Sequence, residues 1–236
     1  MKSQTTQKTM KRNIYKILFV GLAIYSLSLV AVEVCTSQDY VRHYFSDITG
    51  PVPFFAINTT LSVFLLWGTA LLFGVCIAAT PKTPAFKSRS IFYLSQVAVF
   101  AYLGFDDRFM FHETIGMWFD VGDHYILGLV AMAQAVMVAT LARDNIPRKA
   151  WHRLGAAVGL FFVMLFFDAI VPHDMLLRLT IEDVAKTWAC VFFCLYAWET
   201  LMSCLKQLQT DDSPQELQVA SVATQRSETK QPVTAV

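Results

Sequence analysis

The sequence predicts an all-α membrane protein, built as a bundle of six transmembrane helices. Composition is the first reason: 55% of the 236 residues are hydrophobic and only 16% are charged, whereas about 25% of the residues of soluble domains are charged. The second reason is a series of long apolar runs. These runs lack the alternating pattern of barrel strands, and lipid offers the backbone no hydrogen-bond partners, so the segments that cross the membrane are predicted to be helices.

Six apolar runs are long enough to cross a hydrocarbon layer of about 30 Å, which takes about 20 helical residues. The predicted spans are residues 14–34, 56–79, 90–110, 124–142, 154–171 and 184–205. The first run follows a basic start, as a signal peptide would. It is too long for a signal core and has no small-x-small cleavage site before Cys35, so we interpret it as a retained span.

The basic residues predict how the bundle is oriented. With six spans, 15 of the 19 basic residues fall in the N-terminal segment, in the second and fourth loops and in the C-terminal segment. The positive-inside rule therefore predicts that both termini are cytoplasmic. A net charge of +1 gives no basic surface for nucleic acid. Short loops and compact size favour a bacterial inner (plasma) membrane.

The chain divides into three parts. Residues 1–13 form a cytoplasmic N-terminal segment, and residues 14–206 form the transmembrane domain. Residues 207–236 are rich in Gln, Ser, Thr and Pro, with almost no large apolar side chains. Such a segment cannot bury enough surface to offset its loss of conformational entropy, so we expect a disordered cytoplasmic tail.

Acidic residues and histidines gather on the outward half of the predicted bundle. Residues 103–128, "LGFDDRFMFHETIGMWFDVGDHYILG", contain the densest group. An unpaired charge within a span costs about 2.5 to 3.5 kcal/mol on insertion scales, which makes such residues candidates for function. Structural ion pairs are the alternative, for example Asp107 with Arg108, or Glu182 with Lys186 four residues later.

Several outer helix ends supply carboxylate and imidazole groups at similar depth, and we expect these groups to approach one another in space. This is the material for a site for zinc or another divalent metal, or for a proton-handling network. The segment "HETIG" is not a metalloprotease motif, because Gly116 stands where a second histidine is needed. The candidate metal ligands are Asp107, His112, Glu113, His124, Asp168 and His173.

Two segments resemble the alkaline-ceramidase-type membrane hydrolases: "FFAINTTLS" at residues 54–62 and "FHETIGMWFDVGDH" at residues 111–124. The resemblance implies that His112 is a zinc ligand, that Asp123 is the catalytic partner of the zinc-bound water, and that Ser62 assists. That family has seven spans and takes two further ligands from a histidine pair near its last helix. This chain has no such pair there, so His124 or His173 would have to substitute.

Three classes of function follow from these observations. The first is a metal-assisted hydrolase that faces outward and acts on a membrane lipid or another amphiphile. The second is a small carrier, or a protein that handles protons or cations with the same carboxylates. The third is a structural or assembly factor whose polar outer face docks a partner.

Overall fold

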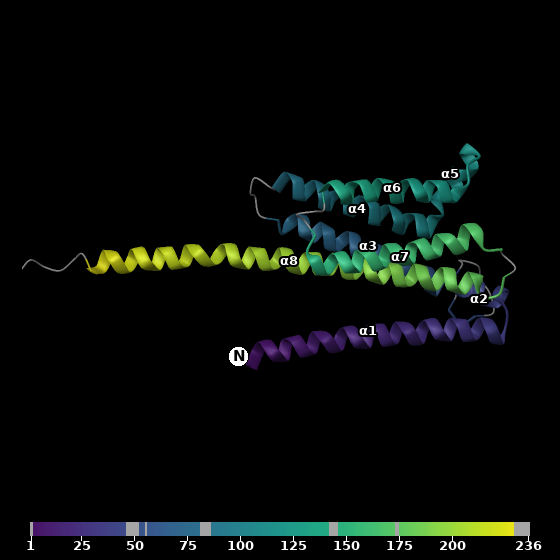
Figure 1. Ribbon diagram of the computed structural model, residues 1–236, viewed down its shortest axis with the longest axis horizontal. Coiled ribbons are helices and arrows are strands. Elements are labelled where there is room, and N and C mark those ends of the chain that lie inside the picture. Colours follow the sequence, from purple (N-terminus) through teal and green to yellow (C-terminus); the bar gives the residue numbers. More distant parts are fainter. Residues whose placement is uncertain are drawn as a thin grey trace, which may run out of the picture.

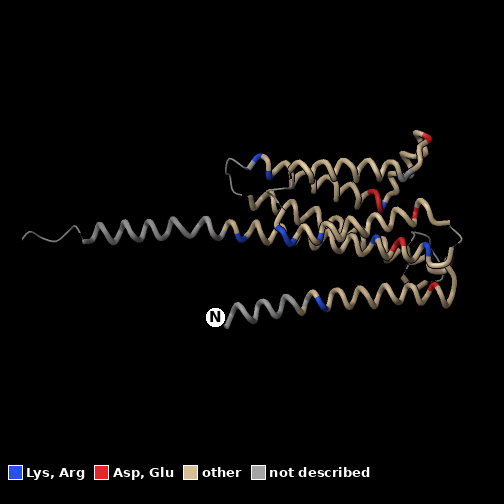
Figure 2. The backbone as a smooth tube through the Cα atoms, viewed as in Figure 1, with Lys and Arg blue, Asp and Glu red and all other residues tan. Residues whose placement is uncertain are grey.

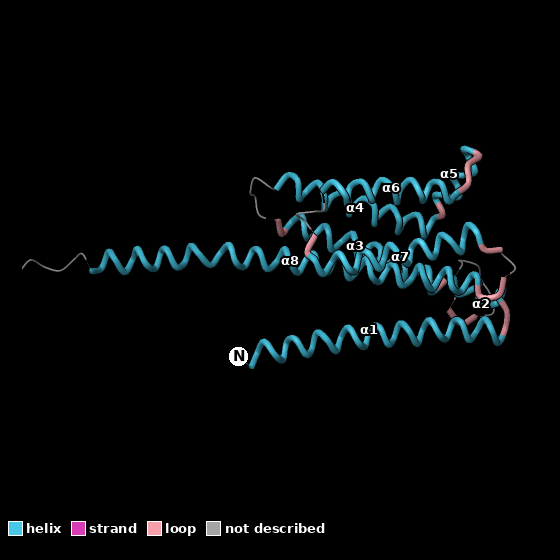
Figure 3. The backbone as a smooth tube through the Cα atoms, viewed as in Figure 1, coloured by secondary structure: helices cyan, strands magenta, loops and turns pink. Residues whose placement is uncertain are grey.

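The computed structural model is helical throughout most of the residues that it describes, which are 2–45, 52–54, 56–80, 86–141, 146–172 and 175–228. The helices lie side by side in a bundle, and α8 extends well beyond it (Figures 1 and 3). The start of α1 and the far end of α8 lie at the same end of the bundle. In chain order the helices are α1 (Lys2–Cys35), α2 (Gln38–Phe45), α3 (Ile57–Ala78), α4 (Phe86–Phe109), α5 (Phe111–Phe119), α6 (Asp123–Leu141), α7 (Arg148–Ile170) and α8 (Arg178–Glu228).

Helices occupy all six ranges in which the sequence predicted spans, namely α1, α3, α4, α6, α7 and α8. Among the described residues, four segments are both long and apolar enough to cross a membrane, and Tyr125–Leu141 is apolar but shorter. The prediction of a helical membrane protein is thereby confirmed. The four segments are Tyr15–Cys35, Ile57–Ala78, Arg148–Ile170 and Arg178–Leu208.

The helix α8 is the centre of the bundle. It packs along α7 and α3, while α4 packs on the other side of α3 and α6 packs on α4. The helices α1 and α2 lie against α8 and complete one edge. Residues of α3, α4 and α8 therefore meet in the interior although they are distant in the chain.

Aromatic side chains fill the interior between α3, α4 and α8. Phe73, Phe100 and Tyr196 are each 0 or 1% exposed. The ring centroids of Phe73 and Phe100 are 6.1 Å apart, and those of Phe73 and Tyr196 are 5.2 Å apart, which is the usual range for attractive aromatic pairs. Large apolar side chains also cover the outside: Leu71 and Phe162 are 70% and 62% exposed. Such a surface suits contact with lipid.

The contact between α3 and α4 depends on a glycine. A Cβ atom added at Gly104 would lie 2.4 Å from Cδ1 of Trp67, far inside van der Waals contact. The indole of Trp67 also packs on Phe105, with ring centroids 5.2 Å apart. Close approach of helices at small residues is typical of membrane proteins.

One polar group lies in the middle of the bundle, between α4, α6 and α8. The Gln134 amide donates to Gln96 Oε1 at 2.6 Å, and the Tyr196 hydroxyl donates to the same oxygen at 3.4 Å. The Gln96 amide in turn lies 3.4 Å from Gln134 Oε1. Paired amides satisfy each other, so this group joins α6 to α4 without an unpaired polar atom.

Acidic and basic residues are distributed unevenly between the two ends of the bundle. Most of the acidic residues shown in Figure 2 lie toward the end that carries α2 and α5, and several basic residues lie toward the opposite end. Beyond the bundle, the backbone of residues 207–228 continues α8, whereas the composition of this stretch predicts disorder from residue 207. The cytoplasmic tail stays a prediction.

Candidate functional site

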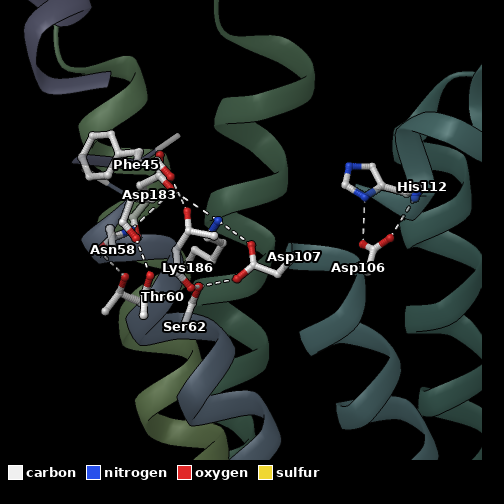
Figure 4. A network of polar contacts seen from close by, with 12 residues as sticks. Phe45, Asn58, Thr60, Ser62, Asp106, Asp107, His112, Asp183 and Lys186 are labelled. Carbon is white, nitrogen blue, oxygen red and sulfur yellow. Dashed lines mark hydrogen bonds and ion pairs between the residues drawn. The ribbon is translucent and has the colours of Figure 1, made fainter. Parts of the chain in front are cut away.

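Two adjacent carboxylates near the end of α4 point to different neighbours. Successive residues of a helix are about 100° apart around its axis. Asp107 therefore faces α3 and α8, while Asp106 faces α5 (Figure 4). The described polar side chains at this end of the bundle form separate groups, whereas the sequence predicted a single cluster.

Lys186 of α8 is the centre of the first group, which we call the Asp107–Lys186 cluster: Asn58, Ser62, Asp107, Asp183 and Lys186. The ammonium nitrogen lies 2.8 Å from Oδ1 of Asp107 and 3.3 Å from Oδ1 of Asp183. Ser62 of α3 donates to Oδ2 of Asp107. The cluster therefore connects α3, α4 and α8 in the interior of the bundle (Figure 4).

Asn58 extends the cluster toward α1. Its side-chain amide lies 3.3 Å from the Asp183 carbonyl oxygen and 3.5 Å from Asp183 Oδ1. Its Oδ1 accepts from Thr187 at 2.7 Å and from the Tyr25 hydroxyl at 3.3 Å. Because Asn58 and Thr187 are 0 and 1% exposed, these bonds are shielded from solvent and are strong relative to those at a surface.

The Asp107–Lys186 cluster has an odd charge balance. Two carboxylates, Asp107 and Asp183, face one ammonium, Lys186. Their side chains are only 14%, 9% and 23% exposed. When all three groups are ionised, they carry together one net negative charge in a poorly solvated place, and a bound proton or small cation would neutralise it.

Asp106 and His112 form a second group at the junction of α4 and α5. The chain turns there at Met110, whose φ of 51° lies in the left-handed region. Oδ1 of Asp106 accepts from the backbone N–H of His112 at 2.8 Å, and Oδ2 lies 2.8 Å from Nδ1 of the same residue. Asp106 thus caps the first turn of α5 and orients the imidazole ring.

Arg178 forms a third group, which joins the end of α7 to the start of α8. Its guanidinium donates to the carbonyl oxygens of Phe167 and Asp168 at 3.1 and 2.9 Å. It also lies 3.3 Å from Asp168 Oδ1 and 3.3 Å from Glu182 Oε2. Donors to the last carbonyl groups of a helix stabilise its C-terminus, so this arginine, 6% exposed, holds the connection in place.

Glu33 of α1 completes the start of α8. Its Oε1 accepts from the backbone N–H of Leu177 at 2.7 Å, and its Oε2 accepts from the Thr180 hydroxyl. A buried carboxylate at a helix N-terminus satisfies N–H groups that have no partner inside the helix and interacts favourably with the helix dipole. Sequence reasoning missed this contact, because the two elements are more than 140 residues apart.

One ion pair suggested by the sequence, Glu182 with Lys186, is replaced by others. Glu182 pairs with Arg178 rather than with Lys186, and Lys186 pairs with Asp107 and Asp183. Asp107 contacts Lys186 of α8. The physical reason is packing: α8 lies along α3, and the ammonium of its Lys186 lies between Asp107 of α4 and Asp183 of α8.

The predicted site residues are thus dispersed among these groups. Ser62 and Asp107 lie together, His112 lies with Asp106, and Asp168 lies with Arg178. Within the part of the chain that the structure describes, no three His, Cys, Asp or Glu side chains are grouped as metal ligands would be. Four predicted site residues lie outside the described part of the chain. They are His173, which is not described at all, and Glu113, Asp123 and His124, whose side chains are not described.

Two members of the Asp107–Lys186 cluster could have been found by spacing. Asn58 precedes Ser62 by four residues, and Asp183 precedes Lys186 by three, so each pair shares a helix face. That these two faces meet is decided only by the packing of α3 on α8.

Comparison with known proteins gives one family match. No curated protein and no solved structure matches the chain. A family model described as "Domain of unknown function (DUF8692)" matches residues 9–200. This match includes α3 to α7, the apolar part of α1 and all residues of the Asp107–Lys186 cluster. The chain therefore belongs to the DUF8692 family.

Proposed function

We propose that the chain is a six-span protein of a bacterial inner membrane that handles protons or a small monovalent cation at the Asp107–Lys186 cluster. The observation that carries the proposal is the pair of carboxylates, Asp107 and Asp183, held by the single ammonium of Lys186. Ionisable residues inside a membrane bundle mark ion and proton pathways more often than they mark simple structural contacts.

The surrounding groups suit this role. A proton can occupy either carboxylate and be exchanged with the other, because Lys186 contacts both. A cation instead would take oxygen ligands, and the hydroxyl of Ser62 and the carboxylate of Asp107 offer them side by side. In both cases the bound species neutralises the excess negative charge of the cluster.

Ion flux into vesicles tests the proposal. The purified chain is reconstituted with a pH-sensitive dye inside, and a potassium gradient with valinomycin drives protons inward. We expect acidification faster than in empty vesicles, and loss of the excess in Asp107→Asn. The vesicles contain potassium and the external medium contains an impermeant cation; exchanging that external cation for sodium separates a sodium-coupled exchange from proton uptake.

The matched control for this experiment is Asp168→Asn, which changes a carboxylate in the Arg178 group. It should keep the flux, because it does not touch Lys186. Flux no greater than in empty vesicles, in the presence of either cation, contradicts the proposal. So does equal flux in wild type and Asp107→Asn.

In the proposed topology, six spans put both termini on the same side of the membrane, and the distribution of basic residues supports the cytoplasmic side. Cys35 is the exposed cysteine at the outer end of α1. A membrane-impermeant maleimide should label it in intact cells and should fail to label Cys35→Ser. A reporter fused at Val236 should behave as cytoplasmic. Labelling of Cys35 only after permeabilisation would refute the orientation.

A second proposal is a metal-assisted hydrolase that acts on a lipid or another amphiphile and uses zinc or another divalent metal. It is supported by the resemblance to alkaline-ceramidase-type hydrolases and by the Asp106–His112 pair. Histidines that bind metals usually hold their second ring nitrogen against a carboxylate or carbonyl, and Nδ1 of His112 lies 2.8 Å from Asp106.

Metal content tests the second proposal. Protein purified from zinc-supplemented cells should contain about one metal ion per chain, and His112→Ala should lose it. Asp123→Asn should retain most of the metal, because loss of a group that only assists the bound water typically costs roughly 10 to 100-fold in affinity or activity. Metal-free wild-type protein refutes this proposal and leaves the first one intact.

A further inference from the structure

A small cavity lies at the end of the bundle opposite the Asp107–Lys186 cluster. It is found where α4 and α7 begin and where α8 leaves the bundle, and its volume is about 90 Å³. This exceeds the roughly 10 to 15 Å³ needed for one water molecule, and it is well below the ~300 Å³ of the smallest typical ligand pockets. The cavity therefore suits a small chemical group rather than a whole metabolite.

The lining of this cavity is polar and positively charged. Arg89 and Tyr93 contribute from α4, and Thr200, Ser203, Cys204 and Gln207 contribute from one face of α8. Among the described residues, the lining includes one guanidinium and three hydroxyl groups and no carboxylate, and Ile146 and Pro147 complete it. The Thr200 hydroxyl already donates to the Tyr196 carbonyl oxygen, so the guanidinium of Arg89 and the hydroxyl of Ser203 are the groups that the lining offers to an anion.

Arg89 is held in position at this cavity. Its Nη1 donates to Oε1 of Gln207 at 2.9 Å, which uses one of the five N–H donors of the guanidinium. The Tyr93 hydroxyl and Cys204 Sγ are 3.1 Å apart and join α4 to α8 below the arginine. This contact between α4 and α8 does not involve Arg89, whose planar guanidinium matches the geometry of an oxyanion.

We propose that this cavity binds a phosphate group, with Arg89 as the charged contact and Ser203 as a hydroxyl contact. The volume admits one such group, and the basic residues at this end of the bundle (Figure 2) raise the local concentration of anions. Because the cavity lies at helix ends, it is at the depth of lipid headgroups. The phosphate can belong to an anionic lipid or to a free anion, and the chemistry of recognition is the same.

Thermal unfolding of the full chain in detergent tests the proposal. Inorganic phosphate should raise the midpoint of unfolding relative to chloride at equal ionic strength. Arg89→Gln should weaken the apparent affinity for phosphate by about tenfold or more, because a hydrogen bond to a charged group is worth about 1.5 to 3 kcal/mol. The control Lys87→Gln removes an exposed charge from the same helix, outside the cavity, and should leave the affinity unchanged.

Retention of lipid identifies the source of the phosphate. Native mass spectrometry of protein from bilayers of phosphatidic acid and phosphatidylcholine should show phosphatidic acid bound to wild type and to Lys87→Gln, and lost from Arg89→Gln. Phosphatidic acid retained in this pattern assigns the site to a headgroup. Stabilisation by inorganic phosphate without retained lipid assigns it to a free anion.

Two results overturn the proposal. One is the absence of both effects in the wild-type protein. The other is equal binding by wild type and Arg89→Gln. If Arg89→Gln does not fold, Ser203→Ala tests the proposal instead, because it removes a cavity hydroxyl and keeps every charge. Ser203→Ala should weaken phosphate binding several-fold. Unchanged phosphate binding refutes the assignment.

Discussion

Replacing Lys186 by methionine isolates the role of its charge in holding α3, α4 and α8 together. Methionine keeps most of the side-chain volume and removes the ammonium from its contacts at 2.8 Å with Asp107 and 3.3 Å with Asp183. At an effective dielectric constant of about 20, each contact is worth about 5 kcal/mol before desolvation is counted. Desolvation offsets much of this attraction, and removing one partner of a buried ion pair typically costs about 3 to 5 kcal/mol.

This loss should be visible in thermal unfolding of the purified protein in detergent. For a chain of this size, a loss of 1 kcal/mol lowers the unfolding midpoint by about 2 to 4 °C, so Lys186→Met should lower it by about 6 to 20 °C. Adding Asp107→Asn should recover part of the loss, because one of the two stranded carboxylates is removed.

The matched control is Lys149→Met, which changes an exposed lysine in the first turn of α7 and should shift the midpoint little. The reasoning is refuted if Lys186→Met and Lys149→Met have the same small effect. It is also refuted if adding Asp107→Asn to Lys186→Met makes unfolding easier still.

Two further changes test how the bundle is built. Gly104→Ala should destabilise the protein by about 1 to 3 kcal/mol, because the new Cβ would lie 2.4 Å from Trp67; unfolding unchanged by Gly104→Ala would show that the indole has room to move. Glu33→Gln should cost about 1 to 3 kcal/mol, because one acceptor of the buried carboxylate at the start of α8 is replaced by a donor. The control is Glu199→Gln, because Glu199 is partly buried and accepts from the Tyr15 hydroxyl. It should lower the free energy of unfolding clearly less than Glu33→Gln, and equal losses would contradict a special role for Glu33.

The class of protein and the positions of six of its helices were determined by the sequence alone. Apolar length and the need to satisfy backbone hydrogen bonds in lipid are properties of each segment by itself. Helices therefore occupy each of the six predicted ranges. Asp107 was also identified as a candidate, because charged groups are rare in such segments, whereas Ser62 was named only through the resemblance to alkaline-ceramidase-type hydrolases.

Which polar groups meet was decided by tertiary structure. Spacing along α8 suggested that Glu182 would pair with Lys186, whereas the packing of α8 against α3 and α4 presents that ammonium to Asp107. Asp106 and Asp107 are neighbours in sequence, yet helix geometry turns one to α5 and the other into the bundle. The start of α8 is held by a hydrogen bond between Thr180 and Glu33, which are 147 residues apart in the sequence. Spacing within one helix specifies only which side chains share a face, and the identity of the opposing face depends on how the whole set of helices packs.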